Sequence, residues 1–191
     1  MSKKTDLIEK ILAIELGMFL TVPSSEKARC QDSPGAFKLV RGSVFEVWSE
    51  DTLGAYLKDL AEAVKAGRNL MAEKYARMDN RIPCLNLNPK IDDILEIEVE
   101  WQKSVHRKYP HILSGTPATG HCFANFDVYL RSELETYSDK TIESYFGDIL
   151  RAKEEGKNLA DEKNTRIFQK LGYQSLKHAD EDFRKKKGLI A

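Results

Sequence analysis

Two glutamates in this sequence occupy positions where an apolar side chain would be expected. Glu15 and Glu98 each follow an isoleucine by four residues and a leucine by three. Residues three and four apart share one face of a helix, so both carboxylates are predicted to lie on an apolar stripe. An unpaired carboxylate in such a place costs on the order of several kcal/mol. Each should therefore pair with a cation, bind a ligand or take up a proton, as a catalytic acid or base does.

Two alternatives for these glutamates follow from the same pattern. The first is a structural ion pair with Arg41 or Arg131, since buried charges are usually paired. The second is a carboxylate-ligated metal site, as in di-iron helical bundles, which use Glu-x-x-His on two helices. The positions three residues after Glu98 and Glu162 hold tryptophan and threonine instead, so no metal ligand is assigned.

His121 is the histidine with a candidate chemical role. It directly follows a stretch rich in Gly, Pro, Ser and Thr, residues 109–120, which predicts the longest irregular segment of the chain. Binding and catalytic groups are frequent on such loops. The alternative is a solvated loop histidine.

Part of the sequence occurs twice. Residues 48–77 and 137–166 align at an offset of 89 with eleven identical positions. The shared glycine and asparagine fit a left-handed helix end and the cap of the next helix, which would serve folding alone. The identities also supply one charged set in each segment: Glu73, Lys74 and Arg77, then Glu162, Lys163 and Arg166.

These charged sets have two interpretations. Each glutamate precedes an arginine by four residues, which is typical of a surface ion pair on a helix. If two halves instead pack about a pseudo-two-fold axis, the two sets converge on that axis. A homodimer would use the same self-complementary geometry.

Helix signals cover nearly the whole chain, and no segment alternates as a strand does. The sequence predicts an all-α fold of about eight helices, forming one compact domain over residues 1–191 with repeat units at approximately 1–80 and 88–173. The expected helices span residues 2–20, 34–48, 49–67, 69–78, 89–108, 121–137, 141–155 and 157–171, with a last short one from Ser175.

The composition restricts the class of protein. Lys+Arg and Asp+Glu both number 30, and this balance argues against a nucleic-acid-binding protein. Apolar runs are too short for a membrane span, and the first residues do not resemble a secretory signal. Three widely spaced cysteines do not form a disulfide framework, so we expect a cytoplasmic protein. Phosphate-loop, dinucleotide and zinc-protease motifs are absent, and the sequence indicates no particular cofactor.

One decapeptide, residues 69–78, resembles the signature E-K-Y-A-R-M of a bacterial and archaeal family, domain of unknown function 4125. Residues 30–41, 129–138 and 172–176 agree with it, so the resemblance extends from about Ile8 to Leu176. It implies a soluble prokaryotic protein and directs attention to Glu73, Lys74, Arg77 and Arg131, but it implies no reaction.

The leading hypothesis is an enzyme, or the remnant of one, that binds a small anionic metabolite in a cleft between two halves. Glu15 or Glu98 would act as acid or base, since burial makes a carboxylate easier to protonate. The anion would be held by Arg41, Arg131, Lys74 and Lys163. A non-catalytic helical adaptor and a carboxylate-ligated metal protein are the alternatives.

Overall fold

The structure, a computed structural model, describes residues 2–22, 33–112 and 126–188, and within them it contains nine helices and no strand. The prediction of an all-α, single compact domain is confirmed. The helices are α1 (Lys3–Leu20), α2 (Pro34–Phe45), α3 (Glu50–Lys65), α4 (Leu70–Met78), α5 (Lys90–Lys108), α6 (Phe126–Leu134), α7 (Asp139–Glu154), α8 (Leu159–Lys170) and α9 (Leu176–Gly188).

Capping side chains begin α3, α4, α7 and α8; the first two start within a residue of the predicted positions, and α7 and α8 start two residues before and two residues after theirs. Ser49 Oγ accepts the N–H of the residue three positions later at 3.2 Å, and Ser138 does the same at 3.3 Å. Asn69 and Asn158 cap α4 and α8 through their Oδ1 atoms at 2.9 and 3.0 Å. These bonds satisfy backbone donors that a helix start leaves without an intrahelical partner.

Two glycines end the helices that precede those asparagines. Gly67 and Gly156 have φ angles of 70° and 67°, in the left-handed region that favours glycine. The residue after each glycine donates its N–H to the carbonyl five residues back at 2.8 Å, which closes the helix end. The helix–Gly–Asn–helix turn that the aligned segments predict is therefore present at both places.

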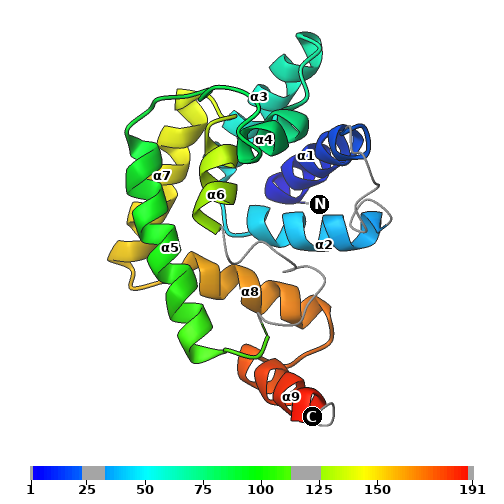
Figure 1. Ribbon diagram of the computed structural model, residues 1–191, viewed down its shortest axis with the longest axis vertical. Helices are drawn as coiled ribbons and strands as arrows, with labels where there is room; N and C mark the ends of the chain where they lie inside the picture. The colour runs from blue at the N-terminus through cyan, green and yellow to red at the C-terminus, as the bar shows by residue number, and fades with distance from the viewer. Residues whose placement is uncertain (1, 23–32, 113–125, 189–191) are drawn as a thin grey trace.

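The helices pack as two groups. α1 contacts α2, α3 and α4, whereas α5 contacts α6, α7 and α8. The groups meet through the pairs α3–α7, α4–α6 and α2–α8. Figure 1 shows α1 and α2 on one side of the molecule, α5 and α7 on the other, and α9 at the far end of α8. A main core lies among these helices, and a smaller apolar cluster packs α9 against α8 and the end of α5.

Two aspartates join α3 and α7 by capping each other's helix. Asp148 on α7 accepts the backbone N–H of Ser49 at 2.8 Å and the hydroxyl of Thr52 at 2.7 Å. Asp59 on α3 accepts the backbone N–H of Ser138 at 3.0 Å. These aspartates occupy aligned positions, so a carboxylate from each aligned segment stabilises the first turn of the other.

No helix in the described ranges is long and apolar enough to cross a membrane.

Asp148→Ala should lower the free energy of unfolding by about 2 kcal/mol, because it removes one buried and one part-buried hydrogen bond at the start of α3. Asp59→Ala should cost about 1 kcal/mol, since Asp59 is more exposed and accepts one of these bonds. Urea unfolding followed by circular dichroism measures both. Equal and negligible losses would contradict the proposed role of this reciprocal capping.

Candidate functional site

Arg41 on α2 is the cation at the centre of the buried polar side chains. Its Nε and Nη2 donate to the two carboxylate oxygens of Glu15 at 2.9 and 2.6 Å. Its Nη1 lies 2.6 Å from Oε1 of Glu133 on α6. All three side chains are buried. The interpretation of Glu15 as a structural ion pair with Arg41 is confirmed.

Glu133 brings a second cation into this group. Nζ of Lys74 lies 3.5 Å from Oε2 of Glu133 and donates to the hydroxyl of Tyr129 at 3.0 Å. The same nitrogen is 4.4 Å from the centre of the Tyr129 ring and 5.1 Å from that of Tyr75. Tyr137 donates its hydroxyl to Oε1 of Glu133 at 2.8 Å. We call Glu15, Arg41, Lys74 and Glu133 the buried network; its formal charge is zero.

The electrostatics of the buried network keep Glu133 and Arg41 charged. Burial acts to raise the pKa of Glu133, but the charges of Arg41 and Lys74 and the hydrogen bond from Tyr137 outweigh it and lower this pKa to about 2. Burial acts to lower the pKa of Arg41, yet the carboxylates of Glu133 and Glu15 raise it well above its ordinary value. Neither group changes its charge near neutral pH.

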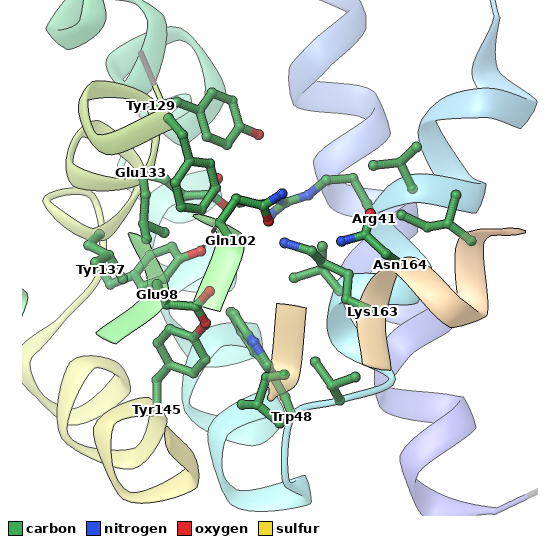
Figure 2. Close-up of a pocket in the computed structure, with 18 residues that line it drawn as sticks. Arg41, Trp48, Glu98, Gln102, Tyr129, Glu133, Tyr137, Tyr145, Lys163 and Asn164 are labelled. Carbon is green, nitrogen blue, oxygen red and sulfur yellow. Dashed lines mark hydrogen bonds and ion pairs between the residues drawn. The ribbon is translucent and has the colours of Figure 1, made fainter. Parts of the chain in front are cut away.

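A cavity of about 170 Å³ lies beside this network, between the two groups of helices. Figure 2 shows Arg41, Lys163 and Asn164 on one side of it and Glu98 and Tyr145 on the other. Its wall is formed by Val40, Arg41, Val44, Val47, Trp48, Glu98, Gln102, Phe126, Tyr129, Leu130, Glu133, Leu134, Tyr137, Tyr145, Leu159, Lys163, Asn164 and Ile167.

Glu98 on α5 is a buried carboxylate of this wall and is 4% exposed. It accepts the hydroxyl of Tyr145 at 2.6 Å, as Glu15 accepts that of Tyr56 at the same distance. Burial and the charge of Glu98 raise the pKa of Tyr145 well above its ordinary value, so the phenol remains a donor. Unlike Glu15, Glu98 has no ion pair within the part of the chain that the structure describes.

The arginine expected beside Glu98 lies elsewhere. Arg131 on α6 forms an ion pair with Asp92 near the protein surface. The interpretation of Glu98 as an ion pair with Arg131 is therefore wrong, because the helix carrying Arg131 directs this side chain outward. The carboxylate of Glu98 faces the cavity with the Tyr145 hydroxyl as its described hydrogen-bond donor.

Three further polar groups of the wall lack protein partners among the described residues. Lys163 forms no ion pair there, and its Nζ lies 5.8 Å from the centre of the Phe126 ring. Gln102 is buried, yet no described group bonds to its amide. The indole N–H of Trp48 is also buried without a hydrogen-bond partner among the described residues, and the centre of its ring lies 4.9 Å from that of Tyr145.

In the charged set on α4, Glu73 and Arg77 form ion pairs with residues outside the cavity wall. Glu73 bonds to Arg68 at 2.6 and 2.8 Å, and Arg77 bonds to Glu135 at 2.6 and 3.3 Å. The expected pairing of Glu73 with Arg77 is thus wrong, because Arg77 extends across to the end of α6. Of this set, Lys74 alone enters the buried network.

The charged set on α8 also divides. Lys163 lines the cavity, whereas Glu162 is half-buried and is not part of its wall. Arg166 extends toward α2, where Nη1 lies 3.7 Å from Glu46. The expected pairing of Glu162 with Arg166 is therefore wrong as well, and the two sets do not converge as groups on one axis.

Neither the His121 site nor the metal-site alternative is supported by the described residues. His121 lies outside the described residues. For the metal alternative, the described ranges contain no cluster of three or more His, Cys, Asp or Glu side chains that could hold a metal ion.

Sequence reasoning missed several groups of the wall. Tyr145 carries a signal, since its alignment with Tyr56 predicts that both tyrosines have the same role. Trp48 and Gln102 show no sequence pattern distinct from an ordinary core residue or a surface residue, respectively. Glu133 lies within a segment of the family resemblance but on no recognised motif.

Comparison with known proteins agrees with the resemblance. The family model described as "Protein of unknown function (DUF4125)" matches residues 5–181, which include every residue of the cavity wall. No curated protein and no solved structure matches the chain.

Arg41→Ala should destabilise the protein by roughly 3–5 kcal/mol, because it leaves two buried carboxylates with one cation between them. The control, Arg131→Ala, should cost less than about 1 kcal/mol, since its ion pair is exposed. Urea unfolding of both variants measures the difference. Similar losses in the two would contradict the structural importance of the Arg41 pair.

The pKa of Glu133 predicts a loss of stability in acid. Its folded pKa is about 2 against an ordinary value of 4.5, so its contribution is fully present above pH 4.5 and disappears as the pH falls toward 2. Between about pH 5 and about pH 3, the wild type should lose roughly 2 kcal/mol more stability than Glu133→Gln. Parallel pH profiles for the two proteins, measured by urea unfolding, would contradict this.

Proposed function

The chain belongs to the DUF4125 family of proteins of unknown function, and from the geometry of its cavity we propose that it binds a small organic metabolite with an anionic group. The observation that carries this proposal is that Lys163, the Gln102 amide and the Trp48 N–H line the cavity without a hydrogen-bond or ion-pair partner among the described residues. Native proteins satisfy nearly all such groups, so the exceptions indicate a site that something else completes.

Lys163 is the residue to which we assign the anionic group. Arg41 and Lys74 are already neutralised by Glu15 and Glu133, and Arg131 lies outside the cavity wall. Lys163 is the remaining cation of the wall, and it forms no ion pair among the described residues. The Trp48 N–H and the Gln102 amide supply further donors on the same wall.

Glu98 is the residue to which we assign acid or base chemistry, if the bound metabolite reacts. Its carboxylate faces the cavity and is oriented by the Tyr145 hydroxyl at 2.6 Å. A positioned carboxylate near a bound ligand is the minimum that proton transfer requires. Glu15 is a poorer candidate because both of its oxygens are occupied by Arg41 and Tyr56.

We further propose that the repeat units, residues 1–80 and 88–173, are two halves related by a pseudo-two-fold axis, with the cavity between them. The support is that aligned residues make the same bonds: tyrosine to glutamate in each half, and aspartate to the opposite helix start. A cavity at such a junction resembles the ligand sites found at domain interfaces.

A thermal-shift screen with small carboxylates, phosphates and sulfates tests the binding proposal. A ligand at a hundred times its Kd should raise the Tm of the wild type by roughly 5–10 °C. Val44→Phe, which fills the cavity, and Lys163→Met should abolish that shift. Val64→Phe, at an exposed position of α3, is the matched control and should retain it.

The proposal fails if no compound shifts the wild type, or if Val44→Phe responds as Val64→Phe does. A stable complex with another protein in a pull-down, without any ligand response, would favour the adaptor interpretation instead.

A further inference from the structure

The two aligned halves treat their charged residues differently. Glu15 and Lys74 in the first half are bound by Arg41 and Glu133 within the buried network. Their counterparts in the second half, Glu98 and Lys163, have no ion pair among the described residues. Both of these counterparts line the cavity, one carboxylate and one ammonium.

From this asymmetry we infer that the ligand is a zwitterion, a small amino acid whose ammonium group binds Glu98 and whose carboxylate binds Lys163. The inference rests on the proposed function and specifies its substrate class. Figure 2 shows the two side chains entering the cavity from opposite sides, Glu98 from α5 and Lys163 from α8.

A purely anionic ligand would leave the Glu98 side unmatched. Such a ligand pairs with Lys163 but adds a second negative charge to a space that already contains the buried Glu98 carboxylate. A buried charge without a partner costs several kcal/mol, on the order of what one good ion pair contributes. A ligand with an ammonium group removes this cost, because it supplies the missing cation.

The hydrogen-bonding capacity of Glu98 points the same way. An ionised carboxylate accepts roughly four hydrogen bonds, and Tyr145 provides one of them at 2.6 Å. An ammonium group carries three donors and no acceptor, so it matches the unused oxygens. The carboxylate of the ligand has the donors of Lys163 and Gln102 available to it.

Aromatic rings around Glu98 also favour a cation. Trp48, Tyr137 and Tyr145 line the cavity, with ring centres 4.9 Å apart for Trp48–Tyr145 and 6.1 Å for Trp48–Tyr137. Ring faces attract an ammonium group, most strongly where water is excluded. The protein already contains such an arrangement, since the Lys74 ammonium lies 3.5 Å from Glu133 and 4.4 Å from the Tyr129 ring centre.

The volume limits the size of the ligand. An apolar cavity of about 150 Å³ holds benzene, so 170 Å³ accommodates roughly six to nine non-hydrogen atoms. Amino acids of four to six carbons fall within about this range. The apolar side chains of Val40, Val44 and Leu130 then contact the hydrocarbon part.

Isothermal titration calorimetry of the full chain with matched probes tests the inference. The zwitterionic probes are 5-aminopentanoate and L-leucine. Each is compared with the acid that lacks the amino group and the amine that lacks the carboxylate: pentanoate and pentylamine, 4-methylpentanoate and 3-methylbutylamine. At least one zwitterion should bind the wild type about tenfold or more tightly than either of its partners.

Variants separate the two ends of the ligand. Glu98→Gln should weaken the zwitterion about tenfold and leave the matched acid unchanged, whereas Lys163→Met should weaken the zwitterion and the acid but not the amine. Glu96→Gln on the exposed face of α5 and Lys153→Met on α7 are the controls and should change nothing. The comparison of probes on the wild type decides the question even if a cavity variant does not fold.

Two results would overturn the inference. The first is an acid that binds the wild type as tightly as its zwitterion and is unaffected by Glu98→Gln; the anion-binding function then stands and the zwitterion falls. The second is no binding by either zwitterion. The proposed function is tested separately by the thermal-shift screen of carboxylates, phosphates and sulfates. It is overturned if that screen finds no ligand whose binding is abolished by Val44→Phe.

Discussion

The Arg41 guanidinium is the group on which the centre of this protein depends. It joins α2 to α1 through Glu15 and to α6 through Glu133, and all three charges are buried. Removing water from these groups is costly, and close pairing together with the Tyr56 and Tyr137 hydrogen bonds offsets that cost. Because the pairs must keep this geometry, they also fix how the first four helices sit against α6, and hence the shape of the cavity beside them.

The second half of the chain uses similar residues without closing the same network. Glu98 keeps its tyrosine, but its arginine counterpart lies at the surface, and Lys163 faces the cavity rather than a carboxylate. An unpaired charge lowers stability unless a ligand completes it. The charges of the first half are thus satisfied by Arg41 and by Glu133 from the second half, whereas Glu98 and Lys163 of the second half face the cavity.

The sequence predicted the helices well because their signals are local. Serine and asparagine caps, and the glycines with positive φ, act within one turn of chain, so their effect does not depend on distant residues. The alignment of residues 48–77 with 137–166 places Tyr56 and Tyr145 at equivalent positions, and each donates to a buried glutamate. By contrast, the predicted pairing of Glu73 with Arg77 was wrong. Glu73 forms its ion pair with Arg68, and Arg77 forms its ion pair with Glu135, because long side chains reach across turns and between helices.

By itself the sequence determined that Glu15 and Glu98 are buried, since each lies on the apolar stripe of its helix. It did not determine that Glu15 is neutralised by Arg41 while Glu98 faces a cavity, because both glutamates have the same local pattern. That difference depends on where α2 and α6 direct their arginines, and therefore on how helices distant in sequence pack. Tertiary structure alone decided which carboxylate pairs with an arginine and which faces a cavity, since burial follows from local periodicity but charge pairing follows from three-dimensional proximity.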